Sequence, residues 1–130
     1  MYKALYACLM TLTISTVANA ADFTKADLCK AAIAVEMGRE VKTMKAGKPL
    51  GGDATISYVR ADDKKSFRYK CRIEGDSIVW ATYFDDEGRW GRWRNSYAEG
   101  DAKTTYEAEG NRLTINNDQV GQQSFLKSDF

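Results

Sequence analysis

The sequence predicts an α+β fold, in which one N-terminal helix packs on a curved antiparallel sheet, a meander of about six strands, and a single disulfide ties the two together. Three observations lead to this prediction. Residues 66–84 read as a hairpin, residues 27–44 carry an apolar stripe of helical period, and each of these stretches holds one cysteine. Cys29 lies on the stripe and Cys71 lies on the apolar side of the hairpin, so helix and sheet should face each other.

The hairpin at Ser66 to Phe84 is the centre of the predicted fold. Apolar and charged residues alternate over 67–74, which is the period of a half-buried strand, and Gly75-Asp76 suits a two-residue turn. The predicted cross-strand pairs are Ile73–Ile78, Cys71–Trp80, Tyr69–Thr82 and Phe67–Phe84. A slip of one residue would separate these apolar residues onto two faces, so the register is well specified.

The helix should begin at a capping box, with Thr24 as the cap and Asp27 three residues later. Its apolar stripe consists of Cys29, Ile33, Met37, Val41 and Met44. We therefore expect one amphipathic helix that ends after Met44, at Ala46-Gly47-Lys48-Pro49. Gly38 falls inside it and marks either a kink or the close approach of a strand residue.

The remaining strands follow from the same alternation. Residues 54–61 should pair with 66–74 across the turn at 62–65, with the pairs Ile56–Cys71, Tyr58–Tyr69 and Arg60–Phe67. Residues 103–109 and 112–116 should form a second hairpin around Gly110-Asn111, with the pairs Ala108–Leu113 and Tyr106–Ile115. A short last strand is expected over 122–127.

The segment from Arg89 to Tyr97 breaks the alternation. Trp90 and Trp93 are three residues apart, whereas residues on one face of a strand are two apart. We interpret Gly91 as a β-bulge that re-aims one of the two indoles. One tryptophan is expected to lie in the core.

The first twenty residues read as a secretory signal peptide. Lys3 gives the positive start, residues 4–17 are mostly apolar, and Ala18-Asn19-Ala20 is an A-x-A cleavage site. The apolar run is too short for a transmembrane anchor. The mature protein is then a single α+β domain, residues 21–130, located in the periplasm or outside the cell, and it does not span the membrane.

Export would change both the net charge of the protein and the number of cysteines available for pairing. Cleavage removes Lys3 and Cys8, which leaves equal numbers of basic and acidic residues and only Cys29 and Cys71. Two cysteines in an oxidising compartment should form a disulfide. A net charge of zero argues against nucleic acid as a partner.

The residue inventory argues against an enzyme. The sequence has no histidine, both mature cysteines are assigned to the bridge, and no nucleotide-binding motif is present, so we expect no cofactor and no metal. Asp85-Asp86-Glu87 could support a carboxylate-based hydrolase or a weak calcium site, but a solvated turn is the preferred interpretation.

Basic and aromatic residues gather on the outward side of the predicted sheet. The candidate binding residues are Arg68, Lys70, Arg72, Tyr83, Arg89, Trp90, Arg92, Trp93 and Arg94. Exposed Trp and Arg commonly anchor protein partners, so the first hypothesis is a small binding protein that engages an envelope or secreted protein as an inhibitor or accessory factor. The alternative is an anionic envelope glycan or lipid headgroup. A purely structural interpretation has the arginine stems covering apolar surface, with Glu74, Glu107 and Glu109 as partners.

Overall fold

The computed structural model describes residues 22–130, and the predicted signal peptide at 1–20 lies outside them. Its helical elements are α1 (Lys25–Met37) and the 3₁₀ turns η1 (Val41–Thr43), η2 (Tyr97–Glu99) and η3 (Lys127–Asp129). Its strands are β1 (Lys45–Ala46), β2 (Ala54–Val59), β3 (Ser66–Glu74), β4 (Ser77–Phe84), β5 (Arg89–Trp90), β6 (Thr104–Glu109), β7 (Arg112–Asn117) and β8 (Gly121–Leu126).

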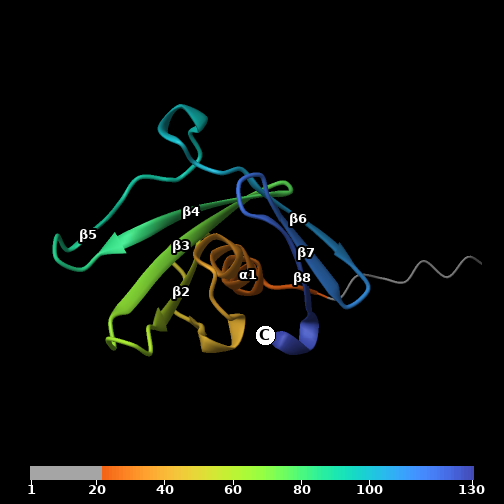
Figure 1. Ribbon diagram of the computed structural model, residues 1–130, viewed down its shortest axis with the longest axis horizontal. Helices are drawn as coiled ribbons and strands as arrows, with labels where there is room; N and C mark the ends of the chain where they lie inside the picture. The colour runs from red at the N-terminus through yellow and green to blue at the C-terminus, as the bar shows by residue number, and fades with distance from the viewer. Residues whose placement is uncertain (1–21) are drawn as a thin grey trace, which may run out of the picture.

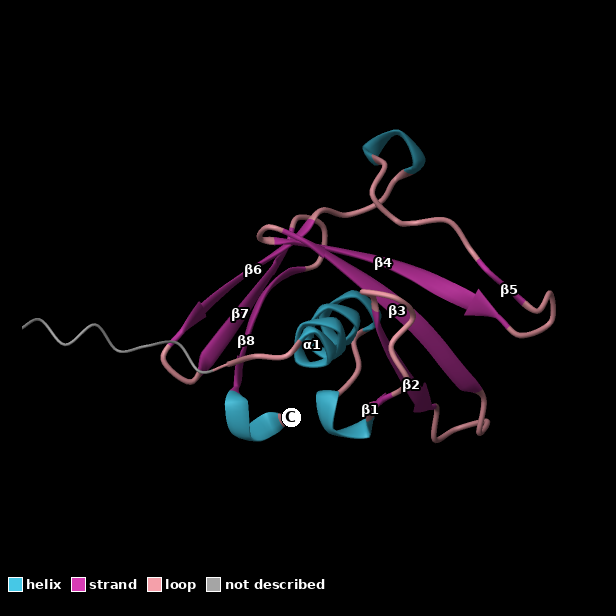
Figure 2. Ribbon diagram, turned by 180° about the vertical axis from the view of Figure 1, so that it is seen from behind, coloured by secondary structure: helices cyan, strands magenta, loops and turns pink. Residues whose placement is uncertain are grey.

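The strands form one antiparallel sheet that curls around α1 (Figure 1). The order is β1-β2-β3-β4-β6-β7-β8, and β5 pairs separately with β4. Seen from behind, β2 and β3 lie on one side of α1 while β6, β7 and β8 lie on the other (Figure 2). The predicted α+β fold is therefore confirmed, with six longer strands and two strands of two residues each.

Helix α1 is buried on most of its circumference rather than along one stripe, because the sheet encloses it. Ala31 and Ala34 are buried together with Cys29 and Ile33 on the predicted stripe. The capping box is confirmed: the Asp27 N–H donates to the Thr24 hydroxyl, and the Thr24 N–H donates to the Asp27 carboxylate, both at 3.0 Å.

The predicted end of this helix is wrong. The helix stops at Met37, and Gly38 adopts the left-handed conformation with φ of 63°. The N–H groups of Gly38 and Arg39 both return to the Ala34 carbonyl, a common way to terminate a helix. The space around Gly38 is open, so a glycine is favoured there by backbone conformation, and a close contact is not the reason.

The disulfide between Cys29 and Cys71 is confirmed. The two Cα atoms are 5.5 Å apart, and both residues are fully buried between α1 and β3. The bridge thus joins the helix to the middle of the central hairpin.

The register of that hairpin is confirmed over most of its length. Observed pairs run from Glu74–Ser77 through Cys71–Trp80 to Tyr69–Thr82. The predicted pair of Phe67 and Phe84 is not formed, because the β3–β4 ladder ends before it and Phe84 pairs with Arg89 of β5.

The predicted register between β2 and β3 is wrong by two residues. Ile56 pairs with Tyr69, and Tyr58 pairs with Phe67. The turn begins earlier than expected, since the Arg60 N–H bonds to the Lys65 carbonyl and the Asp63 carboxylate accepts from Arg60. A shift of two keeps every side chain on its predicted face, so the apolar inner face is preserved.

The second hairpin has the predicted register, including Ala108–Leu113 and Tyr106–Ile115. The last strand, β8, is also present and pairs with β7, one residue earlier at each end than expected. Leu113, Ile115 and Phe125 from these strands complete the core beside α1.

The C-terminus is fastened to the start of α1. Lys127 Nζ lies 2.5 Å from the Asp27 carboxylate, whose side chain is only 10% exposed. The Phe130 ring packs against Phe23 and Phe125, at centroid distances of 6.0 Å and 5.9 Å. Residues at the two ends of the described chain therefore stabilise the same corner of the fold.

The disulfide should contribute a large part of the stability. Replacing Cys29 and Cys71 together by alanine releases a loop with a sequence separation of 42, for which the chain-entropy model gives about 4 kcal/mol. We expect the free energy of unfolding in urea to fall by about that amount. An unchanged denaturation midpoint would contradict this expectation.

The Asp27–Lys127 ion pair should make stability depend on pH. Burial raises the pKa of Asp27, but hydrogen bonds from Lys127 and Thr24 outweigh it and hold the pKa below its usual value. The stabilisation is therefore present above the unfolded pKa, about 3.9, and is lost as pH falls through the lower folded pKa.

We expect Asp27→Asn to destabilise the protein by about 2 kcal/mol at pH 7, and by progressively less as the pH falls below about 4. Urea unfolding of wild type, Asp27→Asn, Lys127→Met and the double variant, at pH 7 and again below about pH 4, measures the coupling free energy between Asp27 and Lys127. Additive effects at pH 7 would show that the pair contributes nothing.

Candidate functional site

A β-bulge after β5 builds the candidate site. The Gly91 N–H donates to the Thr82 carbonyl at 2.7 Å, and the Arg94 N–H donates to the Trp80 carbonyl at 2.8 Å. The chain thus advances three residues while β4 advances two, which inserts one extra residue beside β4. A Cβ at position 91 would lie 2.5 Å from Phe84 Cε2, so only glycine fits without displacing that ring.

The extra residue places both Trp90 and Trp93 on the outer face of the sheet. Residues three apart would otherwise point to opposite faces. Lys70 projects from the outer side of β3, since its neighbours Tyr69 and Cys71 are buried on the inner side. Its Nζ lies 5.0 Å from the Trp90 ring centroid and 4.7 Å from that of Trp93.

These side chains belong to a longer row of rings and cations in contact with one another, which we call the aromatic–cation row. The Arg68 guanidinium lies 4.2 Å from the Tyr83 ring centroid, and that of Arg72 lies 4.6 Å from Trp93. The Tyr83 and Trp90 rings meet edge to face at 5.2 Å. In order of contact, the members of the row are Arg68, Tyr83, Trp90, Lys70, Trp93 and Arg72.

The row covers apolar residues of β4. Val79 and Ala81 point outward, yet they are 5% and 0% exposed, because the rings and cation stems pack over them. The members of the row are themselves half-buried, apart from Arg68, which is exposed. The structural interpretation of the arginine stems is therefore correct in part, but two indoles still contribute to the outer surface.

Carboxylates lie beside both arginines of the row. Arg68 is 3.8 Å from Asp85, and Arg72 Nε is 2.8 Å from Glu74, though without hydrogen-bond geometry. Beside the row, Arg89 pairs with Glu87 at 3.1 Å. Of the predicted partners only Glu74 takes part; Glu107 and Glu109 form no ion pair among the residues described.

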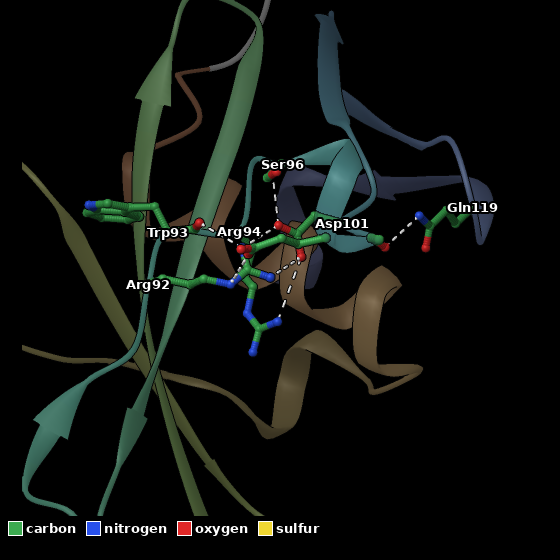
Figure 3. Close-up of polar contacts among 8 residues, drawn as sticks. Arg92, Trp93, Arg94, Ser96, Asp101 and Gln119 are labelled. Atoms are coloured by element: carbon green, nitrogen blue, oxygen red, sulfur yellow. Dashed lines mark hydrogen bonds and ion pairs between the residues drawn. The ribbon is translucent and has the colours of Figure 1, made fainter.

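Arg92 and Arg94 are not part of the row. Both are directed toward Asp101, whereas the Trp93 indole is directed away from it (Figure 3). Arg92 makes a bidentate contact with Asp101 at 2.6 Å and 3.0 Å, and its Nε lies 2.6 Å from Glu99. The Ser96 N–H also donates to Asp101, at 3.0 Å.

Asp101 therefore holds the loop 92–101 in place. Its side chain is 7% exposed, and the hydrogen bond from Arg92 holds the pKa of its carboxyl below the usual value. The sequence carried no signal for this role, because Asp101 sits in a polar loop at no recognisable spacing from the arginines it binds.

The predicted site residues thus lie in three places. Arg68, Lys70, Arg72, Tyr83, Trp90 and Trp93 come together in the row, while Arg89 lies at the β5 turn and Arg92 and Arg94 brace the adjacent loop. The expectation that one of Trp90 and Trp93 lies in the core is wrong. Trp80 of β4 is the core tryptophan, and the Arg94 guanidinium lies 5.7 Å from its ring centroid.

A pocket of about 270 Å³ lies beside the row, between the start of β4 and the loop 94–104. Four charged side chains, Glu74, Arg94, Asp101 and Lys103, contribute to its lining. Its volume is below the range usual for drug-sized ligands.

In the acidic turn at 85–87, Asp85 and Glu87 form the ion pairs with Arg68 and Arg89 described above. Within residues 22–130, no group of three or more Asp, Glu or Cys side chains is placed to hold a metal ion. None of the helices in this part of the chain is long and apolar enough to cross a membrane.

Comparison of the chain with protein-family models, curated proteins and solved structures gave no match.

The loop should depend on Asp101 more than on Glu99. Asp101→Asn removes the charge that Arg92 and Arg94 share, whereas Glu99→Gln alters one exposed contact. We expect amide exchange over 92–101 to speed up about tenfold in Asp101→Asn and to change little in Glu99→Gln. Equal protection in both variants, measured by mass spectrometry, would contradict this role.

Proposed function

We propose that this chain is an exported, non-enzymatic binding protein that engages another protein through the aromatic–cation row. The observation that carries the proposal is the placement of both Trp90 and Trp93 next to Lys70 on the outer face, by a bulge that only glycine accommodates. The partner is an envelope or secreted protein, and the chain acts on it as an inhibitor or accessory factor.

The chemistry of the row supports a protein partner. Tryptophan and arginine are enriched among the residues that dominate binding energy at protein interfaces, because they combine large apolar area with a polar group. The row is also closely packed: its rings and cations contact one another, and they lie on the paired strands β3 and β4. Such a surface loses little conformational entropy when it binds.

The charge distribution favours this over an anionic glycan or lipid headgroup, which remains the alternative. Five of the six basic residues on and beside the row already have a carboxylate within 4.0 Å. A polyanion would have to compete with these carboxylates and would be repelled by them.

The disulfide supports the proposal of export, since such bridges persist mainly in oxidising compartments. With the predicted signal peptide, the proposed location is the periplasm or the outside of the cell. The pairing of Asp85 and Glu87 with arginines is the reason for preferring a binding role over the carboxylate hydrolase.

Photo-crosslinking tests the proposed surface. A crosslinker at position 90 should trap a defined partner from envelope extract, and the purified partner should then bind Trp93→Ala at least about tenfold more weakly than wild type. Leu126→Ala is the matched control, because Leu126 is an exposed apolar residue on β8, outside the row.

Circular dichroism and thermal unfolding show whether Trp93→Ala remains folded. Equal affinity of folded Trp93→Ala and wild type for the partner would refute the proposal. Affinity that falls steeply with salt, together with binding to sulfated oligosaccharide, would instead favour the polyanion.

A further inference from the structure

Lys70 differs from the other basic residues on and beside the row. Arg68, Arg72, Arg89, Arg92 and Arg94 each lie within 4.0 Å of a carboxylate oxygen, whereas Lys70 Nζ has no such partner among the residues described. Residues 1–21 cannot supply one, because they contain no Asp or Glu.

The surroundings of Lys70 leave its ammonium group partly dehydrated. The ring centroids of Trp90 and Trp93 lie 5.0 Å and 4.7 Å from its Nζ, and the side chain is half-buried. Its cross-strand neighbours are Thr55 and Ala81, neither of which carries a charge. Cation–π contacts offset part of the cost of dehydration, but they leave the N–H donors without an anionic acceptor.

We propose, building on the function proposed above, that Lys70 and the two indoles form a socket for one carboxylate side chain, an Asp or Glu of the partner protein. The indoles orient the ammonium and exclude water, so an incoming carboxylate forms a charge-assisted hydrogen bond in a medium less polar than water. The aromatic side walls contact the methylene groups of the same acidic residue.

A single carboxylate fits the charge at this point better than a phosphate or sulfate chain does. The socket offers one uncompensated positive charge. On either side of it stand Arg68 and Arg72, which are already accompanied by Asp85 and Glu74. A polymer of anions would bring its next charges against these two carboxylates.

The socket can be tested without knowing the partner. The probes are N-acetyl-glutamate N-methylamide and its uncharged counterpart N-acetyl-glutamine N-methylamide, titrated into the full mature protein while the indole N–H signals are followed by NMR. We expect saturable shifts of Trp90 and Trp93 with the glutamate probe only. Lys70→Gln should weaken binding at least tenfold, and Lys70→Arg should retain it because a guanidinium keeps the charge and stacks on indoles.

Several results would overturn the socket. These are equal shifts from both probes, unchanged binding in Lys70→Gln, or tighter, strongly salt-dependent binding of a sulfated disaccharide at the same indoles. Circular dichroism and thermal unfolding show whether Lys70→Gln keeps its fold. Lost binding of the glutamate probe in Lys70→Arg would also overturn the socket.

The partner assay separates this inference from the proposed function. Loss of partner binding in Trp93→Ala with full binding in Lys70→Gln would refute the carboxylate socket and retain the binding surface. Full binding in both variants would refute both proposals.

Discussion

The curl of the sheet around α1, fixed by the Cys29–Cys71 bridge, is the constraint on which the rest of the structure depends. The helix fills the inner side of the sheet and is buried on most of its circumference, so the small and apolar residues of α1 follow from this enclosure. The outer side of β3 and β4 is then the broad face left for large aromatic side chains that cannot enter the core. The aromatic–cation row occupies that face, and the bulge at Gly91 places both of its indoles there.

Much of the fold was predictable because it is encoded locally. Alternation and two-residue turns specified the β3–β4 and β6–β7 registers, since a one-residue slip would expose the core. The errors in the end of the helix and in the β2–β3 register arose where the local pattern is neutral. Val41 and Met44 are buried and fit the helical period although they follow the end of α1 at Gly38, and a two-residue shift between β2 and β3 leaves every side chain on the same face.

The candidate site was predictable only in part. The spacing of Trp90 and Trp93 around Gly91 indicated a bulge, and the structure contains one there. The direction in which the extra residue turns each side chain depends on contacts with β4, which the sequence does not encode locally. The grouping of Arg92 and Arg94 around Asp101 depends on the path of an irregular loop, for which no residue period exists.

The short contact between β4 and β6 affects how the molecule unfolds. Between β4 and β6 the sheet has a single residue pair, Ser77–Thr105, so the β1–β4 ribbon and the β6–β8 ribbon share very little backbone hydrogen bonding. A ribbon of three or four strands is stable in water only when its apolar face is covered, and here α1 covers the apolar faces of both ribbons. Because α1 packs against both ribbons in one core, we expect the helix to couple them, so that the two ribbons unfold together as long as α1 stays packed between them.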